Sequence, residues 1–202
     1  QFTFYATVGT FVIGSGVFLR LIIAYVSSDF ALINVYQNSH SAKPLLYKIT
    51  GTWGNHEGSM LLFLWILLAT NTLFALLSRY THKNYVLSVQ AIITLLITIY
   101  IFFTSSPFLL MGETAPEGRG PNPLLQDIGL AIHPPLLYMG YVGWSLALSF
   151  AVVALLRSNV DHTWSEALAP WLRSAWALLT LGIMLGSWWA YRELGWGGFW
   201  FW

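Results

Sequence analysis

Histidine residues near the ends of apolar segments are the side chains in this chain best suited to bind a metal-containing cofactor. His133 stands in the stretch LAIHPPLLYMGY, and the two prolines that follow it fix φ where a helix begins. A ring held by such a backbone can offer an imidazole nitrogen as an axial ligand to a metal. The same residues also allow a structural interpretation, in which the ring hydrogen-bonds a loop carbonyl.

A second candidate lies in GTWGNHEGSMLLFLW, where Trp53 and His56 precede a long apolar run. Both side chains are expected at a membrane interface, where they could touch a bound ligand or serve as interfacial anchors. Glu57 is explained by the helix dipole, which favours an acidic residue in a first turn. Arg119, in a loop rich in Pro and Gly, is a candidate partner for a carboxylate of the ligand, and Lys48 and Arg192 are alternatives.

The run GWGGFWFW, at 195–202, combines large aromatic rings with small neighbours. Trp and Tyr collect at membrane interfaces, so an aromatic belt is one interpretation. A belt does not require glycines, however, and these would let a flat ligand approach the backbone between the rings. The expected floor for such a ligand is formed by Trp189, Trp196, Gly197, Gly198, Trp200 and Trp202. A macrocycle with an apolar face and two propionates fits this combination and suggests haem.

Composition places these residues in a membrane protein. Hydrophobic residues make up 56% of the chain and charged residues only 8%, against roughly 25% charged in soluble domains. The net charge of +1 and the lack of a Gly-rich phosphate loop give no basis for nucleic-acid binding. Because the sequence has no Cys, it has no disulfide, no thiolate metal site and no Cys nucleophile.

Five segments meet the requirement of about 20 mostly apolar residues for a membrane-spanning helix. They are Phe2–Val26, Ser59–Leu77, Tyr85–Phe103, Pro135–Leu156 and Leu172–Ala190. The expected fold is therefore all-α: a polytopic transmembrane helix bundle with long loops on one side and a Trp-rich interfacial segment. Residues 1–202 are expected to form a single integral-membrane portion.

Charge in the short connections predicts the orientation of this bundle. These connections are basic, with Arg79, Lys83, Arg157 and Arg173 against Asp161 and Glu166. By the positive-inside rule they face the cytoplasm, or the matrix in a mitochondrion. The long loops, with His40, His56 and His133, would then lie on the outer side. His82 and His162 fall among the charged residues of the short connections, where solvated rings are expected.

Three stretches carry a resemblance to a known family. GTWGNHEGSMLL, NPLLQDIGLAIHPPLLYMGYVG and LGSWWAYRELGWGGFWFW are similar, in this order, to stretches of the CcmF family. CcmF is the membrane subunit of the cytochrome c maturation (system I) haem lyase, within a wider group of haem-handling proteins that have a tryptophan-rich WWD motif. The similarity runs from about Asp29 to Trp202.

The resemblance implies a function in cytochrome c maturation. Trp196 to Trp202 would form an outer platform for haem b, and His133 would match one of two outward-facing histidines that hold it. Haem would arrive on the chaperone CcmE, and CcmH-type thiol-reducing partners would present apocytochrome c. The two thiols of its CxxCH motif would then add to the haem vinyl groups as thioethers. The expected location is the bacterial inner membrane with periplasmic loops, or the mitochondrial inner membrane facing the intermembrane space.

The sequence departs from the family pattern at its end. The family motif continues with an acidic residue and a proline, and a second outer histidine and two membrane histidines are expected further on. The chain is therefore expected to be the N-terminal part of a larger protein and not a competent lyase alone, and no catalytic acid or base is evident. Two other functions stay open: a haem delivery or export protein resembling CcmC, and a non-catalytic membrane scaffold.

Overall fold

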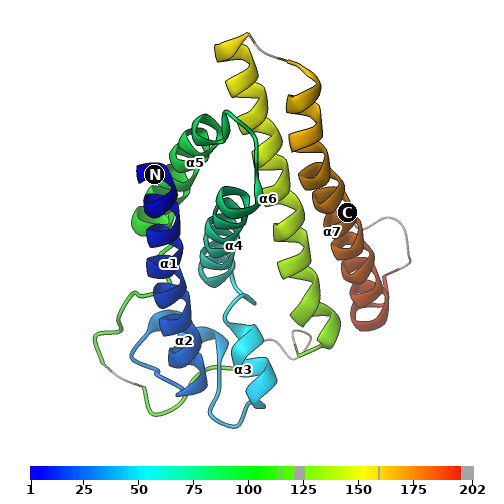
Figure 1. The fold of residues 1–202 in the computed structure, drawn as a ribbon. Helices are drawn as coiled ribbons and strands as arrows, with labels where there is room; N and C mark the ends of the chain where they lie inside the picture. The colour runs from blue at the N-terminus through cyan, green and yellow to red at the C-terminus, as the bar shows by residue number, and fades with distance from the viewer. Residues whose placement is uncertain (114, 121–125, 159, 197–202) are drawn as a thin grey trace.

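Five long helices lie side by side in the molecule, with two short ones at one end (Figure 1). The computed structural model describes residues 1–113, 115–120, 126–158 and 160–196. Its long helices are α1 (Phe2–Val26), α4 (His56–Leu77), α5 (Lys83–Thr104), α6 (Ile128–Arg157) and α7 (His162–Leu194). All five are long and apolar enough to cross a membrane. The predicted all-α class of a polytopic helix bundle is confirmed.

Two of these helices, α6 and α7, begin much earlier than predicted, and an aspartate caps each of them. In α6 the side chain of Asp127 accepts a hydrogen bond from the Gly129 amide at 2.6 Å, so the helix begins at Ile128 and not at Pro135. In α7 the side chain of Asp161 accepts from the Trp164 amide at 2.8 Å, and the helix begins well before Leu172. His133 therefore lies inside a helix and not in the loop before it.

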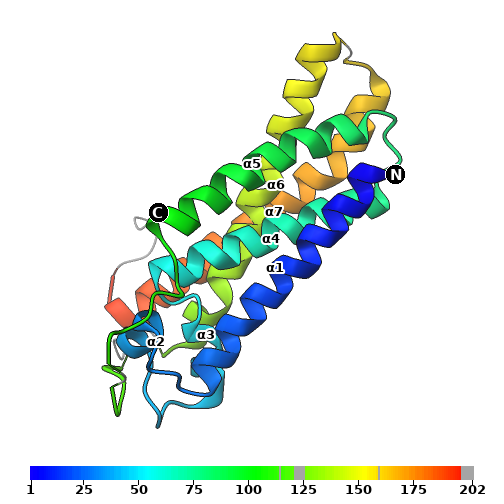
Figure 2. The ribbon, with the colours of Figure 1, turned by 90° about the vertical axis from the view of Figure 1, so that its left-hand side faces the viewer.

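The centre of the bundle is α4, which packs against α1, α5 and α6. Figure 2 shows α4 running between α1 and α5. The core is formed by fully buried side chains of α4, such as Leu67 and Phe74, and of its neighbours, such as Leu21 on α1 and Phe150 on α6. Burying an apolar side chain of this size stabilises the fold by about 1.5–3 kcal/mol where the alternative is water.

A polar contact inside the bundle joins α5 to α6. Gln90 is fully buried, and its Nε2 donates to the hydroxyls of Ser145 and Ser149 at 3.0 Å each. The Ser145 hydroxyl also lies 3.2 Å from the Gln90 carbonyl oxygen. Hydrogen bonds between polar side chains hold membrane helices together, since an unpaired carboxamide in hydrocarbon is costly. This contact fixes α6 against the rest of the bundle.

The long loops form a layer over one end of the bundle, called here the loop cap and made of residues 27–55, 105–113 and 115–120. It includes the short helices α2 (Ile33–Asn38) and α3 (Leu45–Gly51). The two parts pair through main-chain bonds from Ile33 to Leu109 at 2.9 Å and from Met111 to Ala31 at 2.8 Å. These pairings fix the loop before α6 against the segment before α4.

Candidate functional site

Glycines on α7 allow α6 to pack very close to it. A Cβ added at Gly182 would lie 2.8 Å from the main-chain nitrogen of Leu137, and one added at Gly186 would lie 2.7 Å from Nδ1 of His133. Both distances are shorter than real Cβ contacts, so the packing depends on glycine at these positions. Small residues four apart are a usual means by which membrane helices approach each other. The His133 ring is therefore seated against α7 at Gly186.

A cleft of about 400 Å³ opens beside this contact. Its walls come from the early turns of α6 and the last turns of α7. It is lined by His133, Leu137, Tyr141, Ile183, Gly186, Ser187, Trp189, Ala190 and Trp196. One imidazole among aromatic and aliphatic side chains is a composition typical of a site for a flat, mostly apolar ligand.

Trp196 reaches this cleft because the chain turns sharply where α7 ends. Gly195 has a φ of 64°, in the left-handed region that favours glycine. The amide of Trp196 then donates to the Ala190 carbonyl at 3.3 Å. This turn places Trp196, two residues past the end of α7, beside the last turn of that helix.

Two nitrogens beside the cleft are buried without a hydrogen-bond partner among the described residues: Nδ1 of His133 and Nε1 of Trp189. Such an orphaned polar group costs about 1–3 kcal/mol and usually has an explanation. Nε2 of His133 is not among these buried unpartnered atoms, and the His133 side chain is part of the cleft lining. An imidazole in the cleft wall and a nearby indole N–H without a partner are groups that a ligand with both a metal and a hydrogen-bond acceptor could use.

The side chains around His133 do not form a site for a bare metal ion. Within the described ranges, no group of three or more His, Asp or Glu side chains comes together in a metal-binding arrangement. A metal at His133 would therefore need most of its coordination positions filled by another molecule. A metal held inside a macrocycle meets this condition.

An ion pair frames the mouth of the cleft. Nη2 of Arg192 lies 3.4 Å from Oδ2 of Asp127, the buried residue that caps α6. The guanidinium also lies over the Trp188 ring, 4.6 Å from its centroid. These contacts tie the end of α7 to the start of α6, so the relative position of the two cleft walls is fixed.

The structure brings together three of the residues predicted for the site, namely His133, Trp189 and Trp196. His56 and Arg119 lie elsewhere. Nε2 of His56 is 3.3 Å from the Tyr100 hydroxyl, at the ends of α4 and α5. Gly197, Gly198, Trp200 and Trp202 lie outside the described residues.

Trp53 is not part of the cleft lining, but it contacts the helix that carries His133. Its Nε1 donates to the main-chain carbonyl of Ala131 at 3.2 Å. Trp53 therefore contacts the backbone of α6 close to His133, and its predicted contact with a ligand stays a prediction.

Several residues of the site were not predicted. Tyr141 and Gly186 line the cleft. Arg192 was a candidate partner for a ligand carboxylate, but its ion pair with Asp127 was not predicted. The spacing of Gly182 and Gly186 is a signal that could have been used, because residues four apart share one face of a helix. The ion pair has no comparable signal, since its members are far apart in the sequence.

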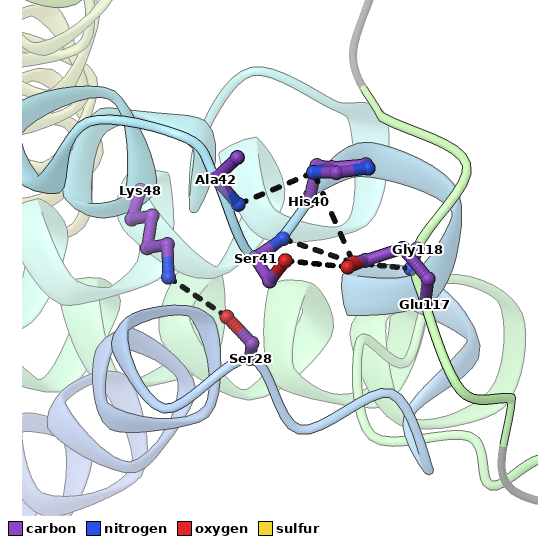
Figure 3. Close-up of polar contacts among 7 residues, drawn as sticks. All are labelled: Ser28, His40, Ser41, Ala42, Lys48, Glu117 and Gly118. Atoms are coloured by element: carbon purple, nitrogen blue, oxygen red, sulfur yellow. Dashed lines mark hydrogen bonds and ion pairs between the residues drawn. The ribbon is translucent and has the colours of Figure 1, made fainter.

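Arg119 belongs to the loop cap. Its guanidinium lies 5.3 Å from the centroid of the Tyr36 ring, and its amide donates to the Tyr36 carbonyl at 2.8 Å. The chain just before it is held by Glu117, whose carboxylate accepts bonds from the amides of Ser41 and Gly118 at 2.9 Å each and from the Ser41 hydroxyl (Figure 3). His40 lies 3.9 Å from the same carboxylate. Arg119 therefore contributes to the structure of the loop cap.

The hydrogen bonds from Ser41 lower the pKa of Glu117 from its ordinary value of 4.5 to about 2. The charged form stabilises the loop cap above pH 4.5, and this stabilisation is lost as the pH falls through about 2. At pH 7 we expect Glu117→Gln to speed amide exchange at Ser41 and Gly118 by roughly threefold to tenfold. Glu113→Gln, at an exposed position on the same loop, is the matched control. Equal exchange rates in both variants would contradict this role for Glu117.

Comparison with known proteins gives the family. A family model described as "Cytochrome C assembly protein" matches residues 53–202, which include α4 to α7. The chain belongs to the cytochrome c assembly protein family. The resemblance to CcmF expected from the three sequence motifs is confirmed by the relatives described next.

The relatives are bacterial cytochrome c biogenesis proteins. "Cytochrome c-type biogenesis protein CycK" of Rhizobium meliloti is 55% identical over 188 residues, covering 92% of this chain and 28% of the relative. CcmF of Escherichia coli is 48% identical over 194 residues, covering 93% of this chain and 30% of the relative. A solved structure titled "Cytochrome c Heme Lyase CcmF" superposes with a TM-score of 0.81 at 29% identity, over 98% of this chain and 32% of that one. The chain thus spans about three tenths of the length of these proteins.

Proposed function

We propose that the cleft between α6 and α7 binds haem b, and that the full-length protein is the membrane subunit of a haem lyase in cytochrome c maturation. The observation that carries the proposal is the setting of His133. Its ring is seated against Gly186 with Nδ1 buried, and His133 lines a cleft that Trp189 and Trp196 also line.

The residues of the cleft suit haem in three respects. His133 would supply an imidazole nitrogen to the iron, from a ring whose position is restricted by close packing against Gly186. The aromatic and aliphatic lining provides apolar surface for the ring. The indole N–H of Trp189, which has no partner in the described chain, suits an acceptor oxygen of a propionate.

The contribution of this chain to the reaction would be to bind and orient. Haem supplies two vinyl groups, to which the cysteine thiols of apocytochrome c add to form thioether bonds. His133 would fix the position of the ring, and the apolar walls would keep water away from the reacting edge. CcmE would deliver the haem and CcmH-type subunits would present the reduced apocytochrome. The cleft would face the bacterial periplasm, or the intermembrane space in a mitochondrion.

Replacement of Trp196 tests whether the aromatic wall holds the ligand. In the full-length protein, Trp196→Ala is expected to weaken haem retention roughly threefold to tenfold, because one ring face is lost. Trp176→Ala is the control, since Trp176 lies on α7 with 64% of its surface exposed and is not a cleft residue. The measurement is haem content after washing, by pyridine haemochrome absorbance, normalised to protein. The same loss in both variants would contradict a binding role for Trp196.

A further inference from the structure

Two consecutive prolines interrupt the hydrogen bonding of α6 next to His133. In an α-helix each amide donates to the carbonyl four residues earlier, and proline has no N–H. Pro134 and Pro135 lie inside α6, so the carbonyls of Leu130 and Ala131 have no helical donor. The turn that carries His133 is therefore less firmly bonded to the rest of the helix than an ordinary turn. Helices bend or hinge at such places.

One of the two carbonyls has a donor from outside the helix. Nε1 of Trp53 donates to the Ala131 carbonyl at 3.2 Å. This is the carbonyl that the Pro135 amide would have bonded if residue 135 were not proline. The indole N–H thus stands in for a missing main-chain donor, two residues from His133.

Trp53 is itself held in place by the loop cap. It follows α3 and precedes Asn55, which caps α4 by accepting from the Gly58 amide at 2.8 Å. Nδ2 of Asn55 donates to the Tyr25 hydroxyl at 2.9 Å, and Nδ2 of Asn34 donates to Oδ1 of Asn55 at 2.8 Å. This network joins α1, α2 and α4, so the indole is placed by three elements that do not touch the cleft themselves.

We propose that Trp53 is a positioning residue for His133, acting through the Ala131 carbonyl that Pro135 leaves without a donor. The bond fixes the first turns of α6 against the loop cap and so sets the direction in which the His133 ring meets its ligand. This inference rests on the proposed function for its effect on haem. Its effect on the backbone can be measured without haem.

The experiment combines loss of the indole donor with return of the main-chain donor. Trp53→Phe keeps an aromatic ring and removes the N–H, whereas Pro135→Ala returns the amide that bonds the Ala131 carbonyl. Pro134→Ala is the matched control, because it returns a donor to Leu130 and leaves Ala131 as it was. The full-length protein is purified as wild type, as W53F, and as W53F combined with either proline replacement.

The first readout is amide exchange of Ile132, Leu136 and Leu137 in the haem-free protein. We expect W53F to speed exchange roughly threefold to tenfold. W53F with P135A returns to the wild-type rate, and W53F with P134A does not. Equal rates in W53F and wild type, or rescue by neither proline replacement, would overturn the positioning role.

The second readout is haem affinity and the absorption spectrum of the haem-loaded protein. We expect W53F to retain haem roughly threefold to tenfold less well than the wild type. W53F combined with P135A is expected to regain the wild-type affinity and spectrum, whereas W53F combined with P134A is not. A wild-type protein that takes up no haem would refute the proposed function, while the exchange data would still decide the positioning role. A haem loss in W53F that P135A does not restore would overturn the inference.

Discussion

Replacing His133 by alanine is expected to lower haem retention by roughly tenfold to a hundredfold, the largest effect of any single change in the cleft. The variant keeps the packing of α6 on α7, because a smaller side chain fits beside Gly186 without a clash. The measurement is the haem-to-protein ratio of the full-length protein after delivery by its chaperone. Haem bound elsewhere in the longer protein is subtracted by recording the spectrum before and after loading.

The control for this change is His162→Ala. His162 lies at the opposite end of α7 with 83% of its side chain exposed, and its ring is 3.4 Å from Glu166. Its loss is expected to leave haem retention unchanged. A similar loss in both variants would mean that the effect comes from expression or folding, and retention of haem by His133→Ala would remove His133 from the site.

Gly186→Ala is expected to have the second-largest effect, through the shape of the site. The added Cβ would lie 2.7 Å from Nδ1 of His133 and 2.9 Å from Cε1, so the ring must move. Forced repacking of this kind costs about 1–3 kcal/mol, and a displaced ring presents Nε2 in the wrong direction. We expect haem retention to fall about tenfold, with a lowered thermal midpoint.

The matched control is Gly16→Ala, also a helical glycine within a membrane span. A Cβ at Gly16 meets nothing within 4 Å, so this change should be neutral or slightly stabilising. Thermal unfolding in detergent and haem titration are measured for both variants. Equal haem affinity in Gly186→Ala and wild type would show that the seating of His133 against α7 does not set its ligation.

The spans were predictable because long apolar runs are a strong signal, but some of their limits were not. Pro135 was expected to begin a helix, whereas α6 begins at Ile128 because Asp127 caps it and the prolines fall within it. The segment between the first two spans was expected to be a long loop, and the structure shows that it contains the short helices α2 and α3. Such short helices depend on tertiary contacts and carry little periodicity of their own.

Part of the candidate site was predictable for a similar reason. His133, Trp189 and Trp196 were chosen by residue type, and the structure gathers them at one cleft. The roles of Trp53 and Arg119 required the fold, because their partners, Ala131 and Tyr36, are distant in the sequence. Residue type and neighbouring sequence can identify side chains that could bind a ligand. The contacts of these side chains depend on how the helices and loops pack.

The measurement that tests the account most directly is a ligand exchange at position 133. His133→Met replaces an imidazole by a thioether, and axial-ligand identity determines the absorption spectrum and reduction potential of haem. Difference spectra and redox titrations of the haem-loaded full-length protein are recorded for wild type and variant. The account predicts an altered spectrum and a higher potential in the variant. An unchanged spectrum and potential, with haem still bound, would contradict the assignment of His133 as the iron ligand in the α6–α7 cleft.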